Sequence, residues 1–230
     1  MEGSLNQGDI DRLREICLRL EEAYRTRPLG NKLDPLDELI YIQLSIRTRE
    51  RAYSRSYENL QGACKGDWNN LLEIPEYVLL SLLETGGMAD VKRQRLISQL
   101  EIILDRFSEA TLAPLAQLTT EDAERFLTAL PGVGPKTARC VLLYSLGRAV
   151  FPVDSHCFRV LDRLGFLPEG MTRKAAHDPL QNMVPADIRH DLHVNLIHHG
   201  RSTCLPRNPT CNCCPILQLC PTGRKLQRQG

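Results

Sequence analysis

Apolar residues recur along most of the chain at the three- and four-residue spacing of amphipathic helices. The first such segment covers residues 9–26, and Asp9 is expected to be its N-cap. Two prolines and a glycine in residues 27–35 separate it from a second helix that begins near Pro35. Further helices are predicted over residues 49–64, 74–84, 91–107, 120–130 and 135–146. Thr120 is the expected N-cap of one of them. No segment alternates like a strand over a useful length, so the pattern predicts an all-α fold.

Composition narrows the class of protein. With 230 residues, 42% of them hydrophobic and 25% charged, the chain is typical of a folded globular protein. No apolar run approaches the ~20 residues of a membrane span. Residues 1–7 are polar and no apolar run follows them, so we expect no export signal, no membrane association and a cytoplasmic location.

The net charge of +1 gives no argument for a nucleic-acid partner. Local clusters of basic residues do offer possible phosphate contacts, although a solvated helix face explains each of them equally well. These clusters are Arg47, Arg49, Arg51 and Arg55 in one segment, and Lys92, Arg93 and Arg95 in another.

A glycine-rich turn separates two of the predicted helices. The sequence "LPGVGPKTA" gives the turn Gly132 and Gly134, which can adopt positive φ angles and allow another backbone to approach closely. Pro135 suits the first position of the helix that follows, whose exposed amides can bind an anion. Lys136 lies in that first turn, where the helix dipole favours the neutral, nucleophilic amine. An ordinary exposed lysine is the alternative.

A second candidate follows eighteen residues later. In "FPVDSHCFRVLDRLG", Asp154 precedes a helical pattern and can be its N-cap without any catalytic role. Together with Lys136, however, its carboxylate can relay a proton and stabilise a developing positive charge.

Four of the nine cysteines are regularly placed near the C-terminus. They are separated by six, two and five residues, and four thiolates at such a spacing can hold either zinc or a [4Fe–4S] cluster. The four are Cys204, Cys211, Cys214 and Cys220. His193, His198 and His199 precede this loop and invite a metal-binding interpretation, whereas the family resemblance described below implies that they pack between helix and loop.

The hairpin and aspartate segments are very similar to those of the helix-hairpin-helix DNA glycosylases, in particular the endonuclease III branch. The resemblance spans about residues 36–220. It implies a two-lobed all-α fold: a six-helix barrel with the hairpin over residues 31–147, and a discontinuous domain of residues 1–30 and 148–230. The second domain would carry a [4Fe–4S] cluster on the loop 204–220.

The resemblance also implies an activity. A monomer would bind double-stranded DNA that holds a damaged base or an abasic site, excise the base and cleave the strand by β-elimination, in base excision repair. Lys136 would form a Schiff base with the sugar, and Asp154 would assist it. Backbone around the hairpin, at Gly132, Val133, Gly134 and Thr137, would contact phosphates. Oxidised pyrimidines are the expected substrates.

One loop departs from the endonuclease III pattern, and a second loop supplies a residue at one of its positions. Where that branch has "LSAQATD", whose glutamine fills the space left by the flipped base, this chain has "LSIRTRE", so Arg47 takes the place of the glutamine. Met88, in "TGGMADVKRQR", takes the position of an apolar wedge. The second segment also resembles plant 5-methylcytosine glycosylases. A mismatched or methylated pyrimidine is therefore an alternative substrate, and a non-catalytic DNA-binding module or a zinc-stabilised interaction protein is an alternative function.

Overall fold

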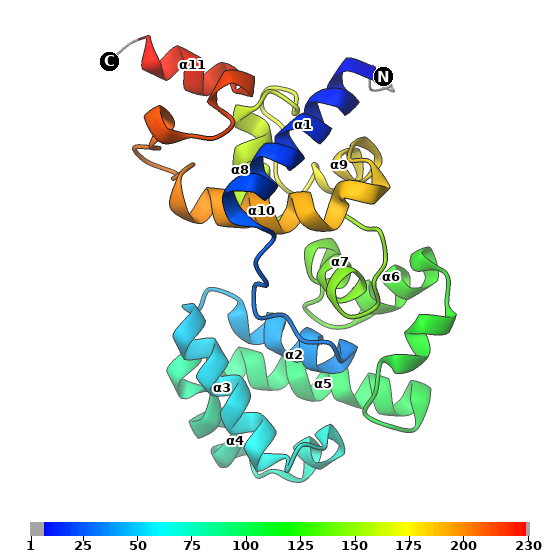
Figure 1. The fold of residues 1–230 in the computed structure, drawn as a ribbon. Helices are drawn as coiled ribbons and strands as arrows, with labels where there is room; N and C mark the ends of the chain where they lie inside the picture. The colour runs from blue at the N-terminus through cyan, green and yellow to red at the C-terminus, as the bar shows by residue number, and fades with distance from the viewer. Residues whose placement is uncertain (1–6, 229–230) are drawn as a thin grey trace. The chain divides into compact units, whose positions relative to one another are not determined.

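The computed structural model describes residues 7–228, and within them the regular structure is entirely helical (Figure 1). This confirms the predicted all-α class. The α-helices are α1 (Gln7–Tyr24), α2 (Pro35–Ser45), α3 (Glu50–Ala63), α4 (Glu76–Leu83), α5 (Ala89–Phe107), α6 (Thr120–Ala129), α7 (Pro135–Tyr144), α8 (Ser155–Arg163), α9 (His177–Met183), α10 (Arg189–Ser202) and α11 (Pro221–Gln227). Each of these helices is too short or too polar to span a lipid bilayer.

The chain forms two compact units. The central unit consists of residues 31–148, and the terminal unit combines residues 1–30 with residues 149–230. The ends of the predicted discontinuous domain, residues 1–6 and 229–230, lie outside the described residues.

In the central unit, α2 is the helix around which the others pack. It contacts α3, α5 and α7, and nine of its eleven residues are buried, which explains its almost continuous apolar sequence. The hairpin of α6 and α7 is closed by a buried ion pair between Arg139 Nε and Glu124 Oε1 at 2.8 Å. Tyr41, Tyr53, Tyr57 and Trp68 form an aromatic cluster beside α2.

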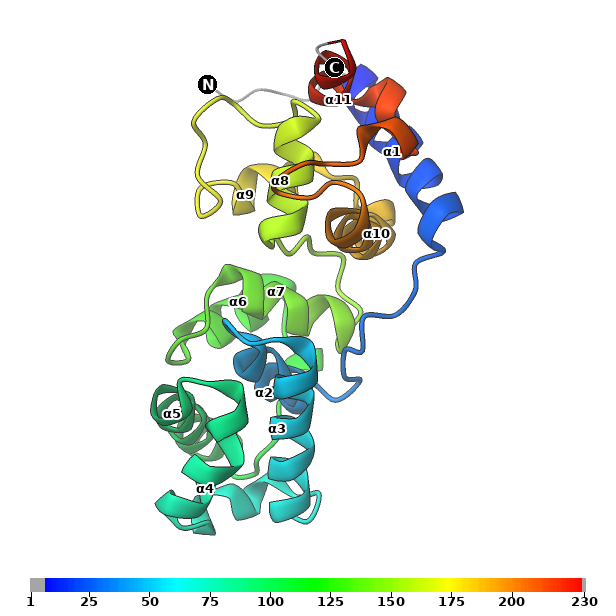
Figure 2. The same cartoon turned by 90° about the vertical axis from the view of Figure 1, so that its left-hand side faces the viewer.

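In the terminal unit, α10 lies between α1 and α8 and is seen along its axis in Figure 2. The buried face of α1, which includes Leu13, Ile16 and Leu20, follows the predicted periodicity and joins one core with α8 and α10. Because α1 comes from the start of the chain and α10 from near its end, this core depends on contacts between distant parts of the sequence.

Two predicted helix starts are wrong by one or two residues. The N-cap of α6 is Thr119, whose Oγ1 accepts a hydrogen bond from the Asp122 N–H at 3.1 Å, and not Thr120, which is the first helical residue. Asp9 lies inside the first turn of α1 instead of capping it. Neighbouring threonines and acidic residues offer several possible caps, and only the backbone path decides among them.

Candidate active site and cysteine loop

Of the two glycines in the turn between α6 and α7, one adopts the positive φ angle that both permit. Gly132 has a φ of 75°, but Gly134, the N-cap of α7, has a φ of −105° and does not need glycine for its backbone angles. A Cβ atom on Gly132 would lie 2.7 Å from Cδ and Nε of Arg95. The positive φ is what favours glycine at position 132, because the atoms of Arg95 in contact are the outer part of a flexible side chain that can shift.

Two buried glutamines hold the carbonyl side of this turn. Gln43 Nε2 donates to the Gly132 carbonyl at 3.2 Å, and Gln99 Nε2 donates to the Pro131 carbonyl at 2.7 Å. The first-turn amides of α7 have no acceptor within the helix, and a glycine N-cap supplies no side chain to them. The turn thus offers its amides, with the positive end of the helix dipole, to an external anion.

The side chains of Val133 and Thr137 are buried. Any contact that these two residues make with a phosphate must therefore go through the backbone. The sequence likewise led us to expect phosphate contacts from the backbone of the hairpin.

Lys136 occupies the first turn of α7 and is partly buried. Glu38 of α2, which is 0% exposed, interacts electrostatically with it. The Glu38 carboxylate accepts hydrogen bonds from the Lys32 N–H at 2.6 Å and from Asn31 Nδ2 at 2.5 Å. Burial raises the pKa of Glu38, and these hydrogen bonds and the charge of Lys136 only partly offset that rise. The sequence analysis missed Glu38, although an acidic residue within the apolar run of α2 is a recognisable signal.

Asp154 is the N-cap of α8. Its Oδ1 accepts hydrogen bonds from the backbone N–H groups of His156 at 2.8 Å and Cys157 at 2.7 Å. Burial by itself would raise the pKa of Asp154, but the charge of His193 and the Cys157 amide outweigh it, so the pKa lies below its usual value. Asp154 is therefore an ionised carboxylate at neutral pH, as a group that stabilises positive charge must be.

The two candidate catalytic residues belong to different compact units: Lys136 to the central unit and Asp154 to the terminal unit. Each lies at the start of a helix: Lys136 follows the glycine turn before α7, and Asp154 caps α8 with its side chain.

Arg47 and Met88, the two residues predicted to enter the DNA, share an unusual backbone. Their φ angles are 53° and 55°, in the left-handed region that residues with a Cβ rarely adopt. Arg47 is exposed in the loop between α2 and α3, and Met88 is 41% exposed at the N-cap of α5. Strained, exposed residues of this kind cluster at functional sites.

The second basic cluster is not the phosphate-facing patch that was considered from the sequence. Lys92 is buried, Arg93 is paired with Glu76 at 3.0 Å and Asp90 at 3.1 Å, and Arg95 packs beneath Gly132. The three side chains point in different directions because of the helical periodicity. Of the two basic clusters, therefore, the one whose side chains are all exposed is that of the four arginines between residues 47 and 55.

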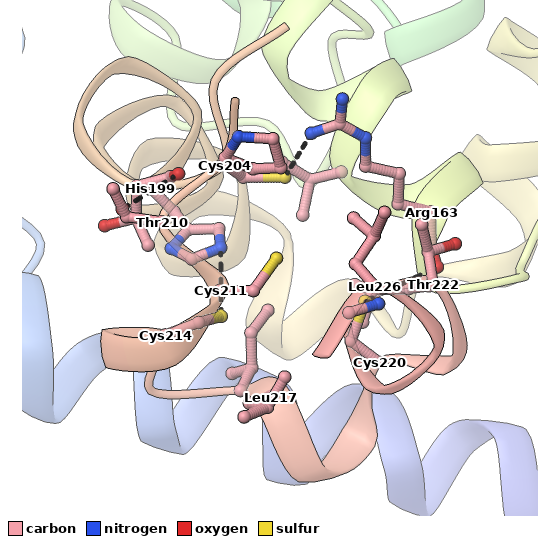
Figure 3. Close-up of a pocket in the computed structure, with 16 residues that line it drawn as sticks. Arg163, His199, Cys204, Thr210, Cys211, Cys214, Leu217, Cys220, Thr222 and Leu226 are labelled. Carbon is pink, nitrogen blue, oxygen red and sulfur yellow. Dashed lines mark hydrogen bonds between the residues drawn. The ribbon is translucent and has the colours of Figure 1, made fainter. Parts of the chain in front are cut away.

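The cysteines at positions 204, 211, 214 and 220 line one pocket of the terminal unit (Figure 3). Arg163 Nη1 donates to Cys204 Sγ at 3.2 Å, and the Gly223 N–H donates to Cys220 Sγ at 3.2 Å. His199 Nε2 lies 3.8 Å from Cys214 Sγ, and its Nδ1 is 2.9 Å from the hydroxyl oxygen of Tyr24. His199 is thus packed between helix and loop, as predicted.

Thiolates are disfavoured in this pocket unless they are bound to a cation. Burial, and to a smaller extent the charges of the other three thiols, raise the pKa of Cys214 to about 11, and burial also raises that of Cys211. Four thiolates would repel one another here without a cation, and Arg163 donates to one of them. By its chemistry, a set of four cysteines is the donor set of an iron–sulfur cluster or of a zinc ion. The side chains as placed do not yet close around a metal, because within residues 7–228 no three His, Cys, Asp or Glu side chains form a group that could hold a metal ion.

The remaining cysteines are separate from this pocket. Cys213 is exposed and does not line it, while Cys17, Cys64, Cys140 and Cys157 are buried. Cys213 therefore offers an internal control for experiments on the pocket.

Comparison with solved structures defines the class of the fold. A non-covalent endonuclease III–DNA complex matches 98% of this chain and 100% of its own protein chain, with a TM-score of 0.82 and 22% identity. A thermostable thymine-DNA glycosylase matches 94% of this chain and 98% of its own, with a TM-score of 0.78 and 20% identity. Together with the hairpin between α6 and α7, these similarities show the fold of the helix-hairpin-helix DNA glycosylases.

Sequence comparison defines the family. Endonuclease III of Escherichia coli (strain K12) is 31% identical over 214 residues, which are 92% of this chain and 96% of the relative. Endonuclease III of Haemophilus influenzae is 30% identical over 93% of this chain and 96% of the relative. No model of a protein family matches the chain. The chain belongs to the endonuclease III family, the bifunctional DNA glycosylases and abasic-site lyases that act on damaged bases in base excision repair.

Proposed function

We propose that the protein excises oxidised pyrimidines from double-stranded DNA through a Schiff base on Lys136. The observation that carries this proposal is the position of Lys136 in the first turn of α7, directly after the glycine turn whose carbonyls are held by Gln43 and Gln99. The backbone amides of that turn, at the positive end of the α7 dipole, would bind a phosphate and so bring the sugar of the damaged nucleotide to the lysine.

The reaction begins once the damaged nucleotide leaves the base stack. Once Lys136 has given up a proton, its Nζ attacks C1′, the bond between C1′ and the base breaks, and the base leaves with the bonding electrons. The amine then loses its proton, the sugar ring opens and a Schiff base forms. Removal of a proton from C2′ finally breaks the bond between C3′ and its oxygen, which cuts the strand.

Asp154 supports this sequence with its ionised carboxylate. It stabilises the positive charge that develops on the sugar as the base departs, and it assists the proton transfers that follow. Arg47 and Met88 fill the space that the flipped base leaves and separate the neighbouring bases. We further propose that the protein acts as a monomer on DNA in the cytoplasm.

The four pocket cysteines would hold a [4Fe–4S] cluster, which would stabilise the loop between α10 and α11. No step of the reaction requires its redox chemistry. Arg163 would neutralise part of the charge on the thiolate ligands.

Sodium borohydride trapping tests the proposed function. The purified protein is incubated with duplexes that carry an abasic site, thymine glycol, dihydrouracil, uracil, 5-methylcytosine or a G:T mismatch. A covalent adduct with thymine glycol or dihydrouracil is the expected result. Adducts with only the mismatched or methylated base would replace the proposed substrate class, and binding without any adduct would indicate a non-catalytic DNA-binding module.

Cys214→Ser tests the cluster. We expect the wild-type protein to be brown, with absorbance near ~400 nm. The substitution should remove most of that absorbance and lower the unfolding temperature by more than about 5 °C, because a metal group bound only by the folded state stabilises it.

The matched control is Cys213→Ser, which changes an exposed thiol one residue away and should leave colour and unfolding temperature unchanged. A colourless wild-type protein with one equivalent of zinc would contradict the cluster and support a zinc site.

A further inference from the structure

Lys92 is a buried cation that the proposed reaction does not use. Its side chain lies on α5 and is only 3% exposed. Its Nζ donates three hydrogen bonds: to the Leu44 carbonyl at 2.7 Å, to Thr48 Oγ1 at 2.6 Å and to the Gly86 carbonyl at 2.8 Å. An ammonium group has three donors, so these acceptors account for all of them.

The three acceptors belong to two separate chain segments. Leu44 and Thr48 lie on either side of the end of α2, and Gly86 lies in the turn before α5. Thr48 Oγ1 also donates to the Gly86 carbonyl at 2.6 Å, so the two segments are bonded to each other as well as to Lys92. Burial lowers the pKa of Lys92. The carbonyl at the end of α2 carries the negative end of a helix dipole, which is a favourable position for a cation.

These contacts fix the backbone next to both proposed DNA-inserting residues. Thr48 directly follows Arg47, and Gly86 is two residues before Met88. The backbone N–H of Lys92 also donates to the Met88 carbonyl at 3.0 Å, but this is the first main-chain bond of α5 and does not depend on the lysine side chain. Since Arg47 and Met88 both adopt left-handed φ angles, their loops need such restraints to keep a single conformation.

The fit around Lys92 is close at Gly86, where a larger residue would require a neighbouring side chain to shift slightly. A Cβ atom on Gly86 would lie 3.3 Å from Lys92 Nζ and 3.2 Å from Ser56 Oγ. Ser56 Oγ also lies 3.1 Å from Thr85 Oγ1, which adds a further bond between α3 and the same turn. The ammonium group therefore sits in a site that the surrounding chain is shaped to hold.

We propose that Lys92 is a positioning residue that joins the Arg47 and Met88 loops into one rigid wedge, so that base flipping depends on it. This inference rests on the proposed function, because it assigns the two loops to DNA insertion. A damaged base must be unstacked before excision, whereas an abasic site has no base to extrude and makes a smaller demand on the wedge. Loss of Lys92 should therefore affect base excision more than cleavage at an abasic site.

The test compares Lys92→Met with wild type on a duplex that carries thymine glycol and on one that carries an abasic site. We expect excision per folded molecule to fall by ~10- to 100-fold, as misplaced groups typically cause, and abasic-site cleavage to fall much less. Unstacking is measured directly from the fluorescence of 2-aminopurine beside the abasic site, and its increase on binding should be reduced. Thr48→Val, which removes one acceptor and the bond to Gly86, should show the same pattern more weakly.

Arg148→Met is the matched control. It removes another cation of the central unit that donates to two backbone carbonyls, those of Ala116 at 2.8 Å and Leu118 at 3.0 Å, outside the two loops. This variant should lower both activities only in proportion to its folded fraction. If Lys92→Met behaves in the same way, or unstacks DNA like wild type, the proposal is overturned. A wild-type protein that cuts neither duplex would contradict the proposed function, while the 2-aminopurine signal would still test Lys92.

Discussion

Lys136→Ala is expected to abolish both the borohydride-trapped adduct and strand cleavage at abasic sites. The substitution removes the only group in the proposed mechanism that can form a Schiff base, and loss of a covalent nucleophile should lower the cleavage rate by at least ~10³-fold. DNA binding should persist, because the phosphate contacts come from backbone amides of the turn and not from this side chain. Single-turnover cleavage and a gel-shift titration measure the two properties separately.

Lys174→Ala is the control for Lys136→Ala, since Lys174 is an exposed lysine of the terminal unit. It should retain trapping and cleavage. Undiminished trapping in purified Lys136→Ala would show that another amine forms the adduct, and would remove Lys136 from the mechanism.

Asp154→Asn is expected to slow cleavage by ~10²- to 10⁴-fold, the usual range for loss of an acid–base group. It should change the free energy of unfolding by less than ~1 kcal/mol, because asparagine is as good an N-cap as aspartate. The asparagine Oδ1 can still accept hydrogen bonds from the amides of His156 and Cys157, so only the negative charge is lost. Chemical denaturation and single-turnover kinetics on the same preparation separate the two effects.

Asp154→Ala supplies the comparison, because it removes the cap as well as the charge. We expect it to lose a further ~1–2 kcal/mol of stability relative to Asp154→Asn. Equal turnover by Asp154→Asn and wild type would mean that Asp154 is a helix cap with no catalytic role.

Local sequence signals were sufficient for the parts of the site that local structure builds. Pro135 at the first position of α7, Gly132 in the turn and Asp154 before α8 each determine a conformation within a few residues, and the structure has a helix start at both predicted places. Which of the two glycines uses a positive φ could not be read from the sequence, because glycine permits positive φ without requiring it.

The surroundings of the site could not be predicted, because they depend on contacts between distant residues. Glu38 meets Lys136 only when α2 packs against α7, and Gln99 reaches the turn only from α5. Lys92 shows the same limit most clearly. Charged and polar residues surround it in the sequence apart from Val91, as on a solvated helix face, yet packing against α2 and the Gly86 turn buries it.

The terminal unit takes its residues from both ends of the chain, and this has a consequence for synthesis on the ribosome. The apolar face of α1 emerges before the whole central unit, but its packing partner α10 emerges only after that unit. The central unit is complete before α10 emerges, so it can fold while the apolar face of α1 is still without its partner. A nascent chain therefore exposes Leu13, Ile16 and Leu20 throughout the synthesis of the central unit, and a stop before α10 leaves this face open to aggregation or to chaperones.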